Sequence, residues 1–67
     1  MAEVFIGMKL RIKPSYAESM RVDKDTTATV IHSTEQDVTI KVDGYAASDS
    51  YTHEQLFENW TRFRVST

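Results

Sequence analysis

The chain of 67 residues is predicted to form one all-β domain, a small barrel of five strands with a short helix or 3-10 turn before the last strand. Three observations support this prediction. Several short runs alternate apolar and polar residues, which is the period of a half-buried strand. Residues that favour turns separate these runs. One stretch near the C-terminus instead carries a signal for the start of a helix.

The first strand is expected over Met8–Lys13, where apolar residues alternate with three cations. Gly7 precedes this run and indicates a bend, and Pro14 ends it because proline has no N–H to donate to a sheet. The segment Ser15–Thr26 has no strand period. Ser15 is expected to cap a single helical turn, and the remainder is expected to form an exposed loop of the length that often carries function.

Two strands are expected next, over Thr27–His32 and Val38–Val42, because both runs are rich in β-branched residues. They flank the polar residues 33–37, which predicts a hairpin whose second strand turns its apolar side chains to one buried face. Asp43-Gly44 follows as a turn dipeptide that tolerates positive φ. A short, irregular fourth strand is expected within Tyr45–Tyr51.

Near the C-terminus, Thr52-His-Glu-Gln55 matches a capping box, in which the Thr and Gln side chains satisfy N–H groups at a helix start. A short helix is therefore expected over His53–Asn59. The final strand is expected over Thr61–Val65, with its arginines directed outward. The large side chains expected to face the core are Leu56, Phe57, Trp60, Phe63 and Val65.

This order of elements resembles the small SH3-like barrels, in which the first and last strands commonly pair. The resemblance covers most of the chain. It is carried by Gly7-Met8, Ala28–Ile31, Val38–Gly44, Tyr51 and the helix that contains Leu56. It implies a single SH3-like domain over residues 1–67, a fold that usually binds partners with its long first loop and the aromatic side chains beside it.

A narrower resemblance is to a family of very short phage and prophage proteins of unknown function. It is carried by Val38–Ile40, Asp43–Tyr45 and Phe57–Arg62, whereas Ala46–Ser50 departs from the family pattern. This resemblance implies an accessory protein that binds a host or phage protein. It transfers no active residue to this chain.

The composition excludes several classes of protein. Hydrophobic residues make up 40% and charged residues 27%, which is typical of a globular domain. The absence of cysteine excludes disulfides and thiolate zinc sites and fits a reducing compartment. Met1–Leu10 lacks the pattern of a signal peptide, and no apolar run approaches the ~20 residues that span a bilayer. We therefore expect a cytoplasmic protein that does not insert into a membrane.

No motif for catalysis is present. The chain has no cysteine nucleophile, no nucleophile elbow, no phosphate-binding glycine loop and no H-E-x-x-H sequence. His32 and His53, with Glu54 or Asp37, offer the donors of a metal site, but hydrogen-bonded or solvated histidines explain them more simply. We expect no enzymatic activity, no catalytic residue, no cofactor and no metal.

The first candidate binding surface is a basic face. If the first and last strands pair, five of the eight cations share one side of the sheet, while most acids lie in loops, turns and the helix. Such a face fits a protein partner with an acidic patch better than nucleic acid, because no aromatic side chain is expected among these cations. A solvated outer surface is the simplest alternative. The five cations are Lys9, Arg11, Lys13, Arg62 and Arg64.

The second candidate surface is formed by the long first loop and a later turn. These segments hold tyrosine, methionine and arginine, the types enriched at binding hot spots, although core packing competes for the aromatic residues. The residues concerned are Tyr16, Met20, Arg21 and Tyr45. The sequence thus predicts a non-catalytic binding module for a protein partner. A nucleic-acid-binding regulator and a self-associating structural protein, such as a homodimer, remain alternatives.

Overall fold

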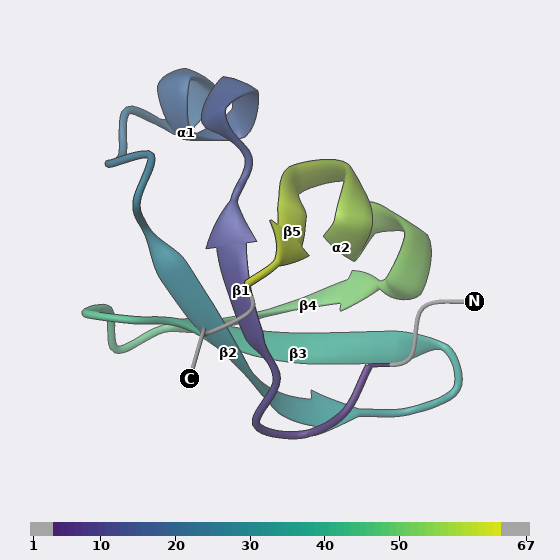
Figure 1. Cartoon of the computed structure of the whole chain (residues 1–67). Coiled ribbons are helices and arrows are strands. Elements are labelled where there is room, and N and C mark those ends of the chain that lie inside the picture. The colour runs from purple at the N-terminus through teal and green to yellow at the C-terminus, as the bar shows by residue number, and fades with distance from the viewer. Residues whose placement is uncertain (1–3, 64–67) are drawn as a thin grey trace.

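Five short strands and two short helices make up the described part of the chain, residues 4–63 of a computed structural model (Figure 1). The elements are β1 (Lys9–Ile12), α1 (Pro14–Met20), β2 (Thr27–Ser33), β3 (Asp37–Val42), β4 (Ser48–Thr52), α2 (His53–Asn59) and β5 (Trp60–Arg62). The order of the five strands and of α2 along the chain agrees with the prediction, whereas the length of α1 and the phase of β5 differ from it.

The strands form one antiparallel sheet in the order β4-β3-β2-β1-β5, which curls strongly into a half-barrel (Figure 1). The expected pairing of the first and last strands is confirmed, since β5 lies beside β1. β4 and β5 are the two edges, and within residues 4–63 they do not pair with each other. Helix α2 contacts β3, β4 and β5 and so bridges the open side of the half-barrel.

The core lies on the concave side of the sheet, as the alternating runs predict. Val38 and Ile40 are buried on one face of β3. The third apolar residue of that strand, Val42, is only half-buried, because it lies at the strand end beside an open groove. The buried core consists of Met8, Leu10, Ile12, Ala17, Ala28, Val30, Val38, Ile40, Leu56 and Trp60.

Helix α1 is longer than the single turn predicted at Ser15. Its N-cap position is Lys13, and Pro14 occupies the first turn, where a fixed φ near −65° suits the helix and the missing N–H is no loss. Ala17 is buried against the core, which anchors the helix. Arg21 ends it in the left-handed conformation, with φ 58°, and donates its backbone N–H to the Glu18 carbonyl at 3.2 Å.

The predicted phase of the last strand is wrong by one residue. Trp60 follows directly after α2 and lies opposite Ile12, so its indole takes the inward position. Directly opposite residues in an antiparallel pair share a face, which puts Arg62 on the side of Leu10. Phe63 consequently lies on the outer face and is only half-buried, contrary to the prediction. The predicted positions of Arg64 and Val65 lie outside the described residues.

Two local features of the hairpin and of α2 fix their geometry. The capping box of α2 is confirmed, with the Thr52 side chain accepting from the Gln55 N–H at 3.2 Å. The β2–β3 hairpin is confirmed and carries a bulge between Val30 and His32.

None of the helices between residues 4 and 63 is long and apolar enough to cross a membrane.

Candidate functional site

The structure brings together fewer of the predicted cations than the sequence suggested. Lys9 and Arg11 are both exposed on the outer face of β1. Lys13 lies beyond the strand end and is half-buried, with its backbone N–H donating to the Asn59 carbonyl at 2.9 Å. Arg62 lies on the other face of the sheet, and Arg64 is outside the described residues. The prediction of a five-cation face fails because it depended on the wrong phase of the last strand.

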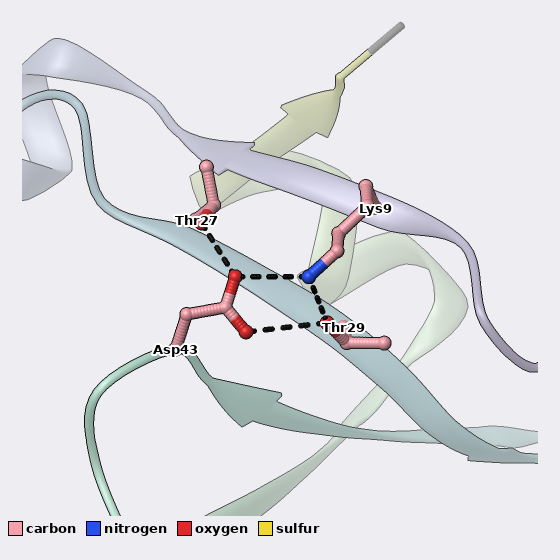
Figure 2. Close-up of polar contacts among 4 residues, drawn as sticks. All are labelled: Lys9, Thr27, Thr29 and Asp43. Atoms are coloured by element: carbon pink, nitrogen blue, oxygen red, sulfur yellow. Dashed lines mark hydrogen bonds and ion pairs between the residues drawn. The ribbon is translucent and has the colours of Figure 1, made fainter. Parts of the chain in front are cut away.

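An acidic residue also lies on this outer face, contrary to the prediction that acids lie elsewhere (Figure 2). The Lys9 ammonium is 3.1 Å from the Asp43 carboxylate, which also accepts hydrogen bonds from Thr27 at 2.5 Å and Thr29 at 3.2 Å. Lys9 donates to the Thr29 hydroxyl at 2.7 Å as well. These four residues, called the Asp43 cluster below, join β1, β2 and the end of β3.

The Asp43 cluster compensates the charge of Lys9. The hydrogen bond from Thr27 is the largest cause that lowers the pKa of the Asp43 carboxyl, and the bond and charge of Lys9 and the bond from Thr29 act in the same direction. Partial burial opposes them. Because the ionised carboxylate is the favoured form, its negative charge offsets the positive charge of Lys9 near pH 7. The hydrogen bonds of the cluster connect β1, β2 and the end of β3.

Arg11, the other outward cation of β1, is stacked on an aromatic ring. Its guanidinium carbon lies 4.6 Å from the centroid of the Phe63 ring. The expectation that no aromatic lies among these cations is therefore wrong. A stacked guanidinium contributes roughly 0.5–1 kcal/mol at an exposed site and retains its charge. The outer face is thus a mixed polar surface with Arg11 as one of its charges.

The second candidate surface forms a groove of about 360 Å³ in the described structure. It lies beside α1, the loop after α1 and the turn between β3 and β4. Tyr16, Met20 and Tyr45, three of the four loop residues singled out from the sequence, line it. Arg21 does not line it, because it serves as the exposed C-cap of α1. The full lining is Ile12, Tyr16, Met20, Val22, Thr26, Val42, Tyr45, Ala47, Asp49, Tyr51 and Trp60.

Local structure explains why these side chains converge. Tyr16 and Met20 are four residues apart on α1 and so share one side of that helix. Asp49 and Tyr51 alternate on β4 and share the face of their buried partners on β3. Gly44, with φ 91°, turns the chain between β3 and β4 and brings Tyr45 toward the groove.

The groove has a buried floor and exposed walls. Trp60 is 3% exposed, and its Nε1–H has no hydrogen-bond acceptor among residues 4–63. Met20 and Tyr45, in contrast, are 55% and 54% exposed. Two large exposed side chains, a methionine and a tyrosine, therefore line the same groove as a buried tryptophan.

Electrostatics in the groove are dominated by one carboxylate. Among the described residues that line the groove, Asp49 is the one acid and none is a lysine or arginine. Burial raises the pKa of the Tyr51 phenol to about 12, and the neighbouring Tyr16 phenol and Asp49 carboxylate add to this shift. At neutral pH the Tyr51 phenol therefore stays protonated and can donate a hydrogen bond to a ligand.

Sequence reasoning missed part of this site. Trp60 was expected in the core, and Asp49 and Tyr51 lay in a segment predicted to be irregular. The available signal was the spacing of Asp49 and Tyr51, which puts both on one side of any strand that contains them.

The two histidines are not brought into a shared site. The His53 ring nitrogen lies 2.8 Å from the Thr34 carbonyl, and this hydrogen bond ties α2 to the β2–β3 turn. His32 is exposed on β2. Within residues 4–63, no group of three or more His, Asp or Glu side chains is arranged to hold a metal ion.

No protein-family model, curated protein or solved structure matches this chain.

Proposed function

We propose that this chain is a non-catalytic binding module of the SH3-like kind, and that its groove holds a short segment of a protein partner. The observation that carries this proposal is the groove itself, in which exposed Met20 and Tyr45 stand over buried Trp60. Tyrosine, tryptophan and methionine are the side chains enriched at the centres of protein interfaces. A groove of about 360 Å³ accommodates one or two partner side chains.

The chemistry of the groove supports binding over catalysis. A general base needs a pKa near the working pH, whereas the pKa of Tyr51 is raised to about 12 and its phenol stays protonated. Asp49 lies on the open side of the groove and has no histidine, serine or lysine among its fellow lining residues. These groups can hydrogen-bond and attract a ligand, but they do not form a nucleophile with its base.

A nucleic-acid-binding role has less support than a protein partner. Such a role needs several unpaired cations on one face, because affinity for phosphate grows with each cation that replaces a counterion. On the outer face of β1, the charge of Lys9 is compensated by Asp43. The same compensation weakens the case for an acidic patch on the partner facing this surface.

Self-association is a second candidate, favoured by one observation. β4 is an edge strand of five residues that pairs on one side with β3, and four of its five residues are exposed. Its sequence, Ser48–Thr52, contains no lysine, proline or bulge, and Asp49, a charge directed to the concave side, is the one device on it that discourages edge pairing. A homodimer built on this edge would cover the wall of the groove that Asp49 and Tyr51 form.

The cellular role we propose is that of a cytoplasmic accessory protein, of phage or prophage type, which occupies a site on a host or phage protein. The support is the likeness of Val38–Ile40, Asp43–Tyr45 and Phe57–Arg62 to very short phage proteins. Two of these three segments border or line the groove, through Tyr45 and Trp60. The likeness therefore falls partly on the surface that we propose to bind.

A pull-down from cell lysate tests the proposed function. The baits are the parent chain, a groove variant (Met20→Ala with Tyr45→Ala) and an outer-face variant (Arg11→Ala with Lys41→Ala). Lys41 lies on β3 opposite Thr29 and so shares the outer face with Lys9. All four side chains are exposed, so both variants should keep the fold, which circular dichroism checks. Each bait is run at low and high salt, with and without nuclease.

The expected result is one defined protein that the parent and the outer-face variant retain and the groove variant loses. A protein lost only with the outer-face variant would move the site to that face. Nuclease-sensitive recovery of nucleic acid would favour the regulator, and recovery of nothing above an empty-bead control would refute the proposal.

A further inference from the structure

The charge of the groove points to the kind of side chain that it binds. Within residues 4–63, the lining combines the rings of Tyr16, Tyr45, Tyr51 and Trp60 with one carboxylate, that of Asp49, and includes no cation. Aromatic faces carry negative quadrupole potential, and a carboxylate adds a full negative charge. A cationic head attached to an apolar stem complements all of these features together.

We infer that the groove binds a lysine or arginine side chain of the protein partner, with the aliphatic stem against the apolar floor and the cationic head between Asp49 and the tyrosine rings. This inference rests on the proposed function, because it names the chemistry of the partner that the groove would hold. It also reverses the sign expected from the sequence, which favoured a partner with an acidic patch.

The position of Asp49 supports a specific role for its charge. Asp49 is exposed on an edge strand, yet its register opposite Ile40 directs it to the concave side of the sheet. Its effect already reaches the groove, because the Asp49 charge contributes to the raised pKa of the Tyr51 phenol. A cation in the groove would be attracted by the same charge.

The neighbouring loop is electrically balanced and leaves the electrostatic preference of the groove to its own lining. Thr26 lines the groove, and the turn before it contains Asp23 and Asp25 on either side of Lys24. The Asp23 carboxylate accepts the Asp25 backbone N–H at 2.8 Å, which holds one acid of this turn in place. Together with exposed Arg21 at the C-cap of α1, this segment carries two acids and two bases, so the preference of the groove for a cation rests on Asp49 and the aromatic rings.

The experiment is a titration of the full chain, labelled with ¹⁵N, with four probes of matched length. n-Butylguanidinium and n-butylammonium represent the arginine and lysine side chains, 1-pentanol is the neutral analogue, and pentanoate is the anionic one. Amide shifts of Met20, Tyr45 and Asp49 report on the groove. The same titration is made with Asp49→Asn and with a control, Glu35→Gln, which removes the same charge from the exposed β2–β3 turn.

We expect both cations to shift the groove amides with saturable binding, and pentanoate to leave them unchanged. Asp49→Asn should weaken cation binding by roughly fivefold, the size of one exposed charge or cation–π contact, while Glu35→Gln should change it less than twofold. Salt should weaken the binding of the cations but not of 1-pentanol.

Three outcomes overturn the inference. The first is equal or tighter binding of 1-pentanol or pentanoate in the groove; in that case the groove recognises apolar segments, and the proposed function stands without the cation. The second is a cation response confined to the outer face. The third is the absence of any groove shift with the cations. None of these results decides the proposed function, which the loss of a protein partner from the Met20 and Tyr45 variant tests separately.

Discussion

Replacement of Trp60 by alanine should unfold much of the population, because this indole is both the inward residue of β5 and the floor of the groove. Trp60 is 3% exposed and lies opposite Ile12 at the closing edge of the core. Truncation of a buried aromatic costs about 3–5 kcal/mol. A domain of this size without disulfide or metal is stable by only about 3–5 kcal/mol, so the two values nearly cancel and about half the molecules or more should be unfolded at 25 °C.

The measurement is urea denaturation followed by far-ultraviolet circular dichroism, because Trp60 is the one tryptophan of the chain and its fluorescence is lost in the variant. Trp60→Phe keeps most of the ring and removes an N–H that has no acceptor, so we expect a loss of about 1–2 kcal/mol. Tyr45→Ala, an exposed aromatic control, should change stability by about 0.5 kcal/mol or less. A Trp60→Ala protein with the parent's midpoint would refute the assignment of Trp60 to the core.

Three further perturbations test other parts of the structure. The pKa of Tyr51 is raised from 10.0 to about 12 in the folded protein, so the stability that its protonated phenol contributes is complete below pH 10 and is lost as pH rises toward 12. In a series of melting temperatures measured against pH, Tyr51→Phe should reduce this loss of stability at alkaline pH. The pKa of Asp43 is lowered in the folded protein, so the stability that its carboxylate contributes is present above pH 3.8 and is lost as pH falls through the folded pKa. Asp43→Asn should remove this loss of stability at acid pH. If the variant loses stability at acid pH as the parent does, the Asp43 cluster does not stabilise the fold. Thr52→Ala should cost about 1 kcal/mol in urea denaturation by removing the cap of α2, whereas exposed Ser50→Ala should cost less.

Much of the fold was predictable because its signals are local. The alternation of Leu10 and Ile12 with cations reports the buried face of β1 directly, and the Thr52–Gln55 pattern reports the start of α2. The phase of β5 was not predictable from alternation alone. Period-2 patterns fit either face when apolar residues occupy both sets of positions, and the burial of bulky Trp60 decided between them.

The candidate site was predictable by residue type but not by arrangement. Tyr16, Met20 and Tyr45 stood out because large apolar side chains in loops need either a core or a partner. Asp43 shows the limit of this reasoning. Its ion pair with Lys9 joins residues 34 positions apart, so only the register of three strands brings them into contact. The same register decides that the positive charge of Lys9 on the outer face is paired with an acid.

The position of Trp60 in both the core and the groove links partner binding to the lifetime of the folded chain. A partner that covers the groove floor binds the folded state and not the unfolded one, so it adds stability by mass action, about 2.7 kcal/mol at a concentration 100 times its dissociation constant. For a domain with so small a margin, that addition is comparable to its whole intrinsic stability. Proteases act on the unfolded fraction, so the abundance of this protein should rise and fall with the abundance of the proposed partner.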